Sequence, residues 1–505
     1  MSTTSAMQEQ AWTAGARPDP RVRKAAIVWM VTLLTAFAAM VVLGITMRLA
    51  QGAAINLSPN TFYAVMTMHG LGMAGALFSA GIVVIWYLIA IRLRSSLAVM
   101  WVSYVLVLLG VIGLLVATLW GGFGAGWFAL YPLPFVNPTW ASWTIGTTIV
   151  SLMIMGVAWL AMQLEVLRAI ASEYGLKRMF GWDYLGKETP AEPLPAGILI
   201  ASVCATAGVL GTITGAATFM IYLFKWLVPA TQFDALLLKN TMFMFGHTIV
   251  NVAMYCGLCA VYVLLPQYTR RPWKVNRLLV IAWNATLVFI LFAYFHHLYM
   301  DFAQPEAIQI LGQVASYGSA LPATAVTIFG VGSQLYRSGI RWTLTPFSFL
   351  AAVTGWAIGG FAALLDATIA FNRVFHNTLW VPGHFHTYFL VGFVLIVFGF
   401  VHHILDSRAE RMAGVGIATM LVGGYGFVLM FYLGGLHSVP RRFASYQMIP
   451  LPSVAEAGTR YALYGGLFAS LFLVGAITLL LAGLVGRRRA ATRAATPVPE
   501  ASVGE

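Results

Sequence analysis

Long apolar segments separated by short polar ones make up most of the chain. Crossing a hydrocarbon core of ~30 Å takes ~20 residues of α-helix, and twelve apolar segments reach that length. These predicted spans lie at residues 26–47, 64–91, 98–121, 143–168, 195–224, 240–266, 277–297, 306–333, 343–370, 381–405, 414–434 and 461–485. The pattern predicts an all-α integral membrane protein with about twelve transmembrane helices and a single domain.

The composition supports this prediction, because 60% of the residues are hydrophobic and 9% are charged, as is typical of membrane-embedded chains. The first 16 residues are polar and lack the apolar region of a signal peptide. The three cysteines, Cys204, Cys256 and Cys259, lie in apolar segments. They are expected to be small apolar side chains, since a zinc site needs further ligands at matching spacing.

The distribution of basic residues predicts the orientation. With a cytoplasmic N-terminus, 22 of the 29 Lys and Arg residues fall in cytoplasmic segments and seven fall outside, which follows the positive-inside rule. We expect both termini to be cytoplasmic, with residues 1–25 as an N-terminal segment, 26–486 as the twelve-helix domain and 487–505 as a disordered tail. The net charge of +13 is explained by this bias, so no nucleic-acid partner is expected. The predicted location is the plasma (inner) membrane.

Six of the ten histidines fall within four predicted spans, all in the outer third of the membrane. They are His69, His247, His296, His297, His384 and His386. Ionisable residues inside a membrane are costly and mark functional sites, and neutral imidazole is a common ligand of iron and copper. Since His384 and His386 are two residues apart, they point ~200° apart around a helix. They cannot bind one ion, but they can bind two cofactors on opposite sides.

Grouping these histidines by helix suggests three ligand sets. His247, His296 and His297 come from two neighbouring spans and could hold one metal with an open position. One heme iron could be clamped from both sides by His69 and His386, and a second heme with one open axial position could be held by His384.

Residues outside this layer are expected to play other parts. Heme propionates need cations at the outer edge, and Arg441 and Arg442 lie there against the charge bias. The uncharged segment 121–140 is expected to pack over a protein surface or a cofactor edge. By contrast, His402 and His403 at the cytoplasmic end of their span are expected to be solvated.

These motifs resemble subunit I of the heme-copper oxidase superfamily. The resemblance covers all twelve spans, and the run 376–386 together with Gly246-His247-Thr248-Ile249-Val250 is most similar to the B-type branch. It implies that His69 and His386 ligate a low-spin heme, and that His384 ligates a high-spin heme. It further implies a copper ion on His247, His296 and His297. The propionates would meet Arg441 and Arg442, with His376 near the high-spin heme edge. Both hemes are expected to be b-type, and iron is the alternative to copper.

One position departs from the family pattern. Oxygen-reducing members of the A and B branches carry a tyrosine four residues after the first copper-ligand histidine, covalently joined to it, whereas this chain has Asn251. An amide cannot supply the electron and proton that a tyrosine gives when the O–O bond breaks. Related nitric oxide reductases lack that tyrosine. We therefore predict reduction of nitric oxide to nitrous oxide; the alternative is a B-type cytochrome c or quinol oxidase in which Tyr255 or Tyr294 takes over.

Two other classes of protein are disfavoured. A secondary transporter would show paired halves with helices broken near the midplane, and a plain electron carrier would need no three-histidine metal site. The chain has no thiolate-rich copper site, so electrons are expected from a partner subunit carrying copper or heme, or from a quinol. Protons could enter from outside past Asp301 and Glu306, or from inside through hydroxyl groups such as Thr248, Thr286 and Tyr255.

Overall fold

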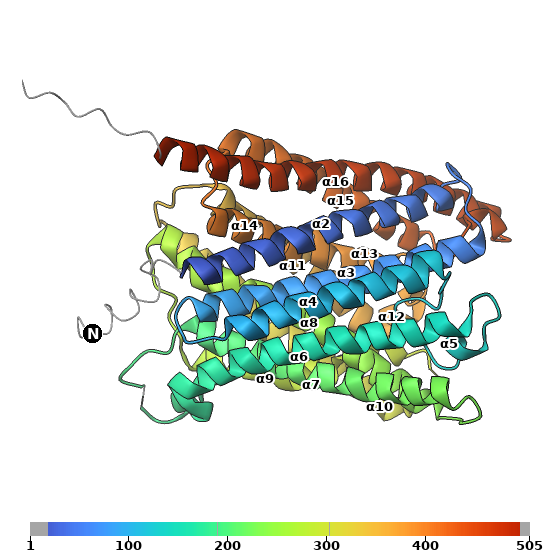
Figure 1. Cartoon of the computed structure of the whole chain (residues 1–505), viewed down its shortest axis with the longest axis horizontal. Coiled ribbons are helices and arrows are strands. Elements are labelled where there is room, and N and C mark those ends of the chain that lie inside the picture. Colours follow the sequence, from blue (N-terminus) through green and yellow to red (C-terminus); the bar gives the residue numbers. More distant parts are fainter. Residues whose placement is uncertain (1–18, 189, 302, 495–505) are drawn as a thin grey trace, which may run out of the picture.

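The computed structural model describes residues 19–188, 190–301 and 303–494, and the elements named in these ranges are helices (Figure 1). Eleven helical segments are long and apolar enough to cross a membrane. They are α2 (Pro20–Gln51), α3 (Pro59–Ala90), α4 (Leu97–Leu115) with the π-helix η1 (Val116–Trp120), α6 (Ser142–Met179) with η2 (Trp182–Leu185), α7 (Ala196–Leu227), α8 (Ala235–Thr269), α10 (Glu306–Leu335), α11 (Leu344–Ala367), α13 (Trp380–Tyr388) with the π-helix η4 (Phe389–Phe393) and α14 (Val394–Leu405), α15 (Glu410–Leu436), and α16 (Pro452–Ala494). Short connecting helices are α5 (Leu133–Val136), α12 (Ile369–Phe375) and η5 (Tyr446–Met448).

The seventh predicted span is built in two parts. Its first part is the 14-residue helix α9 (Arg277–Ile290), which rises ~21 Å. The second is the six-residue 3₁₀-helix η3 (Ala293–Leu298), which adds ~12 Å. Together they reach the ~30 Å of a membrane core, so the prediction of about twelve spans is confirmed.

The helices run along one common axis, and neighbours in sequence pack against each other. The bundle closes because α16 contacts α2 as well as α15. Its central helix is the α13–α14 segment, in which 94% of the most apolar stretch is buried inside the protein. The corresponding buried share is 89% in α8 and 83% in α3, so these two helices also lie in the interior of the bundle. The histidine motif of α13 therefore sits in the middle of the bundle.

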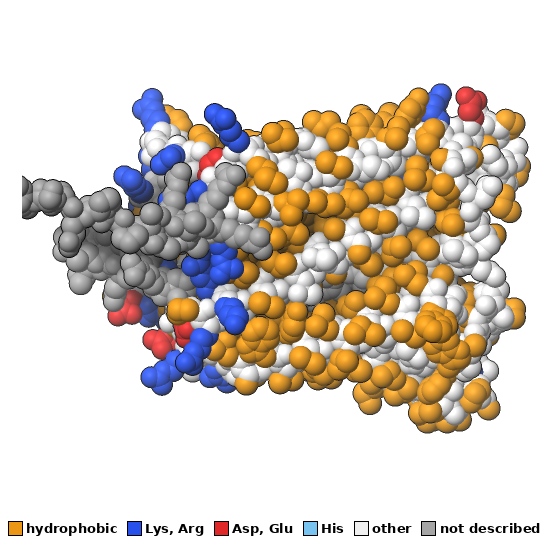
Figure 2. Space-filling view, turned by 45° about the horizontal axis from the view of Figure 1, so that its top comes forward, with side chains coloured by type: hydrophobic (Ala, Val, Ile, Leu, Met, Phe, Trp, Pro, Cys, Tyr) orange, Lys and Arg blue, Asp and Glu red, His pale blue; other side chains and the backbone are white. Residues whose placement is uncertain are grey.

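The charge distribution in space agrees with the predicted orientation. Figure 2 shows Lys and Arg gathered at one end of the molecule, with an apolar band covering the length beyond them. Helix α2 begins and α16 ends at this same end. The protein is a multi-pass membrane protein, and its terminal residues 1–18 and 495–505 lie outside the described residues.

The prediction of solvated histidines at the cytoplasmic end of α14 was wrong for His402, whereas His403 is half-buried. His402 is 5% exposed, and its Nε2 lies 2.9 Å from the carbonyl oxygen of Leu479 on α16. The neighbouring ring of His403 bonds to the hydroxyl of Tyr268 at 2.9 Å. Helix α16 covers this end of α14, which an isolated span does not reveal. The three cysteines are free and buried, as predicted.

Candidate functional site

A cavity of about 620 Å³ surrounds α13 and brings the six histidines of the predicted layer together. Its wall is built by helices α2, α3, α8, α10, α11, α13, α15 and α16, by η3 and η4, and by the loops before α5 and after α15. Asn251, His376, Arg441 and Arg442 also line it. The loop between η1 and α5 contributes Trp127 and Phe128, so the uncharged segment 121–140 packs over the cavity.

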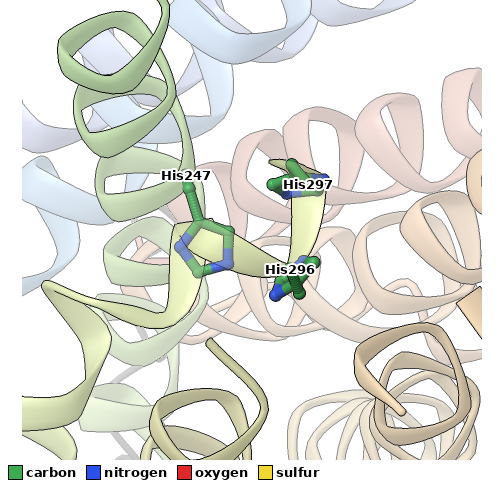
Figure 3. Close-up of side chains that lie close together, drawn as sticks. All are labelled: His247, His296 and His297. Atoms are coloured by element: carbon green, nitrogen blue, oxygen red, sulfur yellow. The ribbon is translucent and has the colours of Figure 1, made fainter. Parts of the chain in front are cut away.

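Three histidines at one side of the cavity form a ready-made metal site (Figure 3). One ligand nitrogen from each of His247, His296 and His297 lies within 4.8 Å of the others. The first comes from α8, whereas the other two are consecutive residues of η3. Their ring centres are 4.1 Å apart, so the tight 3₁₀ turn presents two adjacent side chains to the same point.

Hydrogen bonds determine which nitrogen is available at two of these rings. Nδ1 of His296 lies 3.0 Å from the hydroxyl of Ser316, which itself donates to the carbonyl of Gly312 at 2.6 Å. The serine oxygen therefore accepts the Nδ1 hydrogen, and Nε2 keeps its lone pair. In His247, Nε2 lies 3.1 Å from the amide of Asn251, and Nδ1 is buried with no hydrogen-bond partner in the described part of the chain.

A second pair of histidines faces across the cavity. The rings of His69 on α3 and His386 on α13 have centres 6.5 Å apart and planes 17° apart. Both Nδ1 atoms lie 2.7 Å from backbone carbonyls, those of Met40 and Pro382 respectively. A carbonyl can only accept, so each Nδ1 carries the hydrogen and each Nε2 presents a lone pair. This arrangement is typical of metal-binding histidines.

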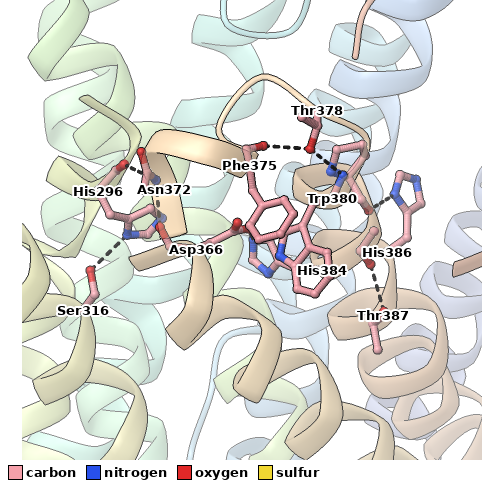
Figure 4. Close-up of polar contacts among 12 residues, drawn as sticks. His296, Ser316, Asp366, Asn372, Phe375, Thr378, Trp380, His384, His386 and Thr387 are labelled. Carbon is pink, nitrogen blue, oxygen red and sulfur yellow. Dashed lines mark hydrogen bonds and ion pairs between the residues drawn. The ribbon is translucent and has the colours of Figure 1, made fainter. Parts of the chain in front are cut away.

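On the other side of α13, His384 points away from His386 (Figure 4). Its Nε2 lies 3.5 Å from Oδ2 of Asp366 at the end of α11. Its Nδ1 is buried and has no hydrogen-bond partner among the described residues. The prediction that two histidines two residues apart serve opposite sides of one helix is consistent with these contacts.

The residues present fit a metal and two hemes. Two metal–nitrogen bonds of ~2 Å each, plus the distance from each ring centre to its edge, account for the 6.5 Å between His69 and His386. The three-histidine set offers imidazole donors that suit copper or iron. A buried ring nitrogen without a partner, as in His247 and His384, is costly unless something binds it.

Comparison with known proteins identifies the family. The model of the family described as "Cytochrome C and Quinol oxidase polypeptide I" matches residues 24–468. The chain belongs to this family. It is therefore a subunit I of the heme-copper oxidases, and the family implies hemes and copper, as the sequence motifs predicted.

Individual relatives of this subunit I are distant. Cytochrome c oxidase polypeptide 1 of Halobacterium salinarum is 27% identical over 253 residues, which cover 49% of this chain and 40% of that protein. For cytochrome c oxidase subunit 1 of Thermus thermophilus, 25% identity extends over 56% of this chain and 55% of the relative. The matches thus span about half of these two relatives. Quinol oxidase subunit 1 of Sulfolobus acidocaldarius is 25% identical over 88% of this chain and 89% of its own length.

A solved structure shows that the same fold extends over nearly all of the chain. The cryo-EM structure of a heme-copper terminal oxidase dimer aligns with a TM-score of 0.75, covering 96% of this chain and 86% of that one. At 18% identity, the likeness establishes the fold alone. The assignment of single residues to hemes or copper stays a prediction.

Buried cations surround the predicted propionate edge. Burial lowers the pKa of Arg441 to about 10 and that of Arg442 to about 9, the latter helped by the charge of Arg441. Both guanidinium groups stay charged at neutral pH, and Arg442 stacks 4.0 Å above the ring of Phe128. Burial and the same Arg441 charge lower the pKa of His376 to about 4, so this ring is neutral. Such arginines favour anionic partners.

Sequence reasoning missed Arg48 of α2, which lines the same cavity as His386. It is 5% exposed, and its Nε and Nη2 have no hydrogen-bond partner in the described chain. Its Nη1 donates to Gln51 at 2.7 Å. The sequence did offer a signal, because Arg48 is one of the seven basic residues that the predicted orientation places on the outer side.

The two tyrosines predicted as alternatives to Asn251 form hydrogen bonds beside the cavity. Tyr255 donates to the backbone oxygen of Ser319 at 3.0 Å, and Tyr294 donates to Asn240 at 3.3 Å. Neither is among the cavity-lining residues, whereas Tyr388 is. Sequence reasoning did not single out Tyr388, although it follows His384 by one helical turn on the same face.

Proposed function

We propose that this subunit I is the catalytic subunit of a membrane reductase that converts nitric oxide to nitrous oxide, with a low-spin heme, a high-spin heme and a copper ion. The observation that carries the proposal is Asn251. Its amide lies 3.1 Å from Nε2 of His247, one turn along α8, where oxygen-reducing members of the A and B branches carry the tyrosine.

The chemistry of an amide fits one reaction better than the other. Joining two nitric oxide molecules into nitrous oxide and water consumes two electrons and two protons. Reducing oxygen to two waters consumes four of each and breaks an O–O bond in one site. Asn251 can donate or accept hydrogen bonds but cannot give up an electron or a proton. Asn251 therefore fits nitric oxide reduction, which needs no electron from a protein side chain.

The protein residues divide the work of holding the groups. His69 and His386 would bind the low-spin heme, His384 the high-spin heme, and the three-histidine set the copper. When bound, the high-spin heme and the copper supply electrons and a pair of metal sites for the gas. Arg441 and Arg442 would hold the propionates by charge-assisted hydrogen bonds. Electrons would come from a partner subunit with copper or heme, or from a quinol.

Polar contacts between α8 and α10 support proton delivery from the cytoplasmic end. Three residues of α8 form hydrogen bonds with α10. They are spaced seven positions apart and therefore lie on one face of the helix. From the cavity inward, the contacts are Tyr255 with Ser319 at 3.0 Å, Tyr262 with Thr327 at 2.8 Å, and Thr269 with Gln334 at 2.6 Å. Buried hydroxyls at such intervals suit a water-bridged path.

Oxygen reduction is the second candidate, because Tyr388 lines the cavity. The discriminating experiment measures turnover of the purified, reduced complex with nitric oxide and with oxygen separately, counting electrons per gas molecule. Fast nitric oxide consumption at one electron per molecule, with slow oxygen use, supports the proposal. Complete four-electron oxygen reduction that Tyr388→Phe abolishes would refute it and assign the tyrosine role to Tyr388.

A further inference from the structure

A continuous series of ring contacts connects the cavity with the basic end of the molecule. In order from the cavity, its members are Tyr388 of α13, Trp356 of α11, Tyr255 of α8, Trp283 of α9, Tyr262 of α8 and Trp273 in the loop between α8 and α9. The centres of successive rings lie 6.5, 6.4, 5.6, 5.9 and 4.0 Å apart. Each ring therefore contacts the next, and we call these six residues the Tyr–Trp series.

The fold fixes both ends of the series. Tyr388 lines the cavity, so the first ring lies beside the candidate metal centre. Trp273 lies in a loop that also carries Arg271 and Lys274, which the predicted orientation places at the cytoplasmic end. Its ring packs so closely on Gly330 of α10 that any side chain there would overlap it. The series thus crosses the cytoplasmic half of the bundle.

Packing alone does not explain the choice of side chains in the series. Each member is no more than 9% exposed, and a buried hydroxyl or indole N–H costs free energy unless it is hydrogen-bonded. Phenylalanine fills similar space without that cost, and the chain holds 32 Phe against 16 Trp and 20 Tyr. No Phe is a member of the series, however. Its members share what Phe lacks, a ring that gives up an electron to a strong oxidant.

We propose that the Tyr–Trp series delivers single electrons to the cavity when a peroxide reacts there and the normal electron donor is exhausted. Tyrosine and tryptophan are oxidised at similar potentials, so no step along the series is strongly uphill. The proposal rests on the proposed function for one point, the metals that would activate the peroxide. It does not depend on whether the gas is nitric oxide or oxygen.

The electrons and protons of this reaction balance. Tyr388 gives one electron and its phenol proton to the peroxide, and it regains the electron from Trp356 and a proton from solvent. The electron vacancy then passes to Trp283 and on to Trp273 across the intervening tyrosine rings, because an indole can lose an electron without losing a proton. A soluble reductant at the cytoplasmic end, such as ascorbate, returns the electron to Trp273. Two such passages, with two protons, reduce one hydrogen peroxide to two waters and spare the metal ligands from oxidation.

The test mixes the oxidised full complex with hydrogen peroxide in the absence of a reductant. Electron paramagnetic resonance of frozen samples, with and without ring-deuterated tryptophan, detects tryptophan radicals, and peptide mass spectrometry maps oxygen adducts at Trp273. We expect the wild type to show both. Trp283→Phe keeps an aromatic ring between Tyr255 and Tyr262 but removes the indole, so adducts at Trp273 should fall several-fold and oxidation should accumulate at Tyr388.

The matched control is Trp86→Phe. Trp86 of α3 is 0% exposed, as is Trp283, and it is not a member of the series. The two variants therefore lose the same buried indole, but only one of them interrupts the ring contacts. We expect the control to keep the wild-type level of adducts at Trp273.

Radicals that form at Tyr388 in the wild type but leave no adducts at Trp273 would overturn the proposal. Equal adducts in Trp283→Phe and the wild type, or an equal loss in Trp86→Phe, would do the same. If Trp283→Phe does not assemble, Trp273→Phe tests the end of the series: ascorbate should quench the wild-type radical faster than that of the variant, and equal rates refute the proposal. A wild-type complex without heme or copper would refute the proposed function and this proposal together.

Discussion

The serine beside His296 offers a quantitative test of the predicted copper site. In Ser316→Ala, Nδ1–H of His296 loses the oxygen that accepts its hydrogen at 3.0 Å. Ser316 is 5% exposed, so water does not readily replace it. An unsatisfied buried donor costs ~1–3 kcal/mol, which corresponds to a loss of copper affinity of about 5–150-fold. This range agrees with that for supporting partners of metal-bound histidines.

The assay follows copper per heme during dialysis against increasing chelator concentrations. The matched control is Ser319→Ala, because the Ser319 hydroxyl donates to the Ser316 carbonyl at 3.0 Å from the same wall of the cavity. We expect Ser316→Ala to release copper at a lower chelator concentration than both the wild type and the control. Identical release from the two serine variants would refute the reasoning that the Ser316 hydroxyl holds the His296 tautomer.

Three further predictions concern other parts of the bundle. Replacing His386 with Ala should remove the low-spin heme signal from the optical spectrum while leaving copper content unchanged, since the three-histidine set lies on the other side of α13. Gly355→Ala should destabilise the protein by about 1–3 kcal/mol or more, because the new methyl group would overlap the Val391 carbonyl. Gly360→Ala is the control, since its methyl group would enter open space. Thermal unfolding in detergent measures the stability of both variants. Tyr262→Phe removes the 2.8 Å contact to α10. It should slow turnover more at high pH, where protons are scarcer, than at low pH. If the turnover of the variant relative to the wild type does not change with pH, a proton path through Tyr262 is contradicted.

The helices and the histidine layer were predictable because each leaves a local signal. A span is a run of apolar residues, and His69 or His247 stands out within such a run without knowledge of its neighbours. The family motifs then added the ligand sets. The end of α9 was harder to predict from the sequence, since the change to a 3₁₀-helix depends on how the pair His296 and His297 packs.

Partners that come from distant parts of the chain were not predictable. Ser316 is 20 residues from His296, and Asp366 is 18 residues from His384; only the helix packing shows that they meet. The same holds for His402, whose burial depends on α16. Tyr388 was overlooked because tyrosine near an apolar run carries no signal of its own, and its place in the cavity follows from the rotation of α13.

The π-helix η4 has a consequence for how this helix can change over time. A π-turn bonds each residue to the fifth along instead of the fourth, so it takes up one extra residue. Because the turn absorbs this residue, deleting any one residue of Phe389–Phe393 would restore regular bonding and leave His384 and His386 pointing toward the same partners. In a regular stretch of helix, the same deletion would rotate both rings by ~100° relative to α14. The histidine motif can therefore tolerate a one-residue deletion within this turn that it could not tolerate elsewhere in the helix.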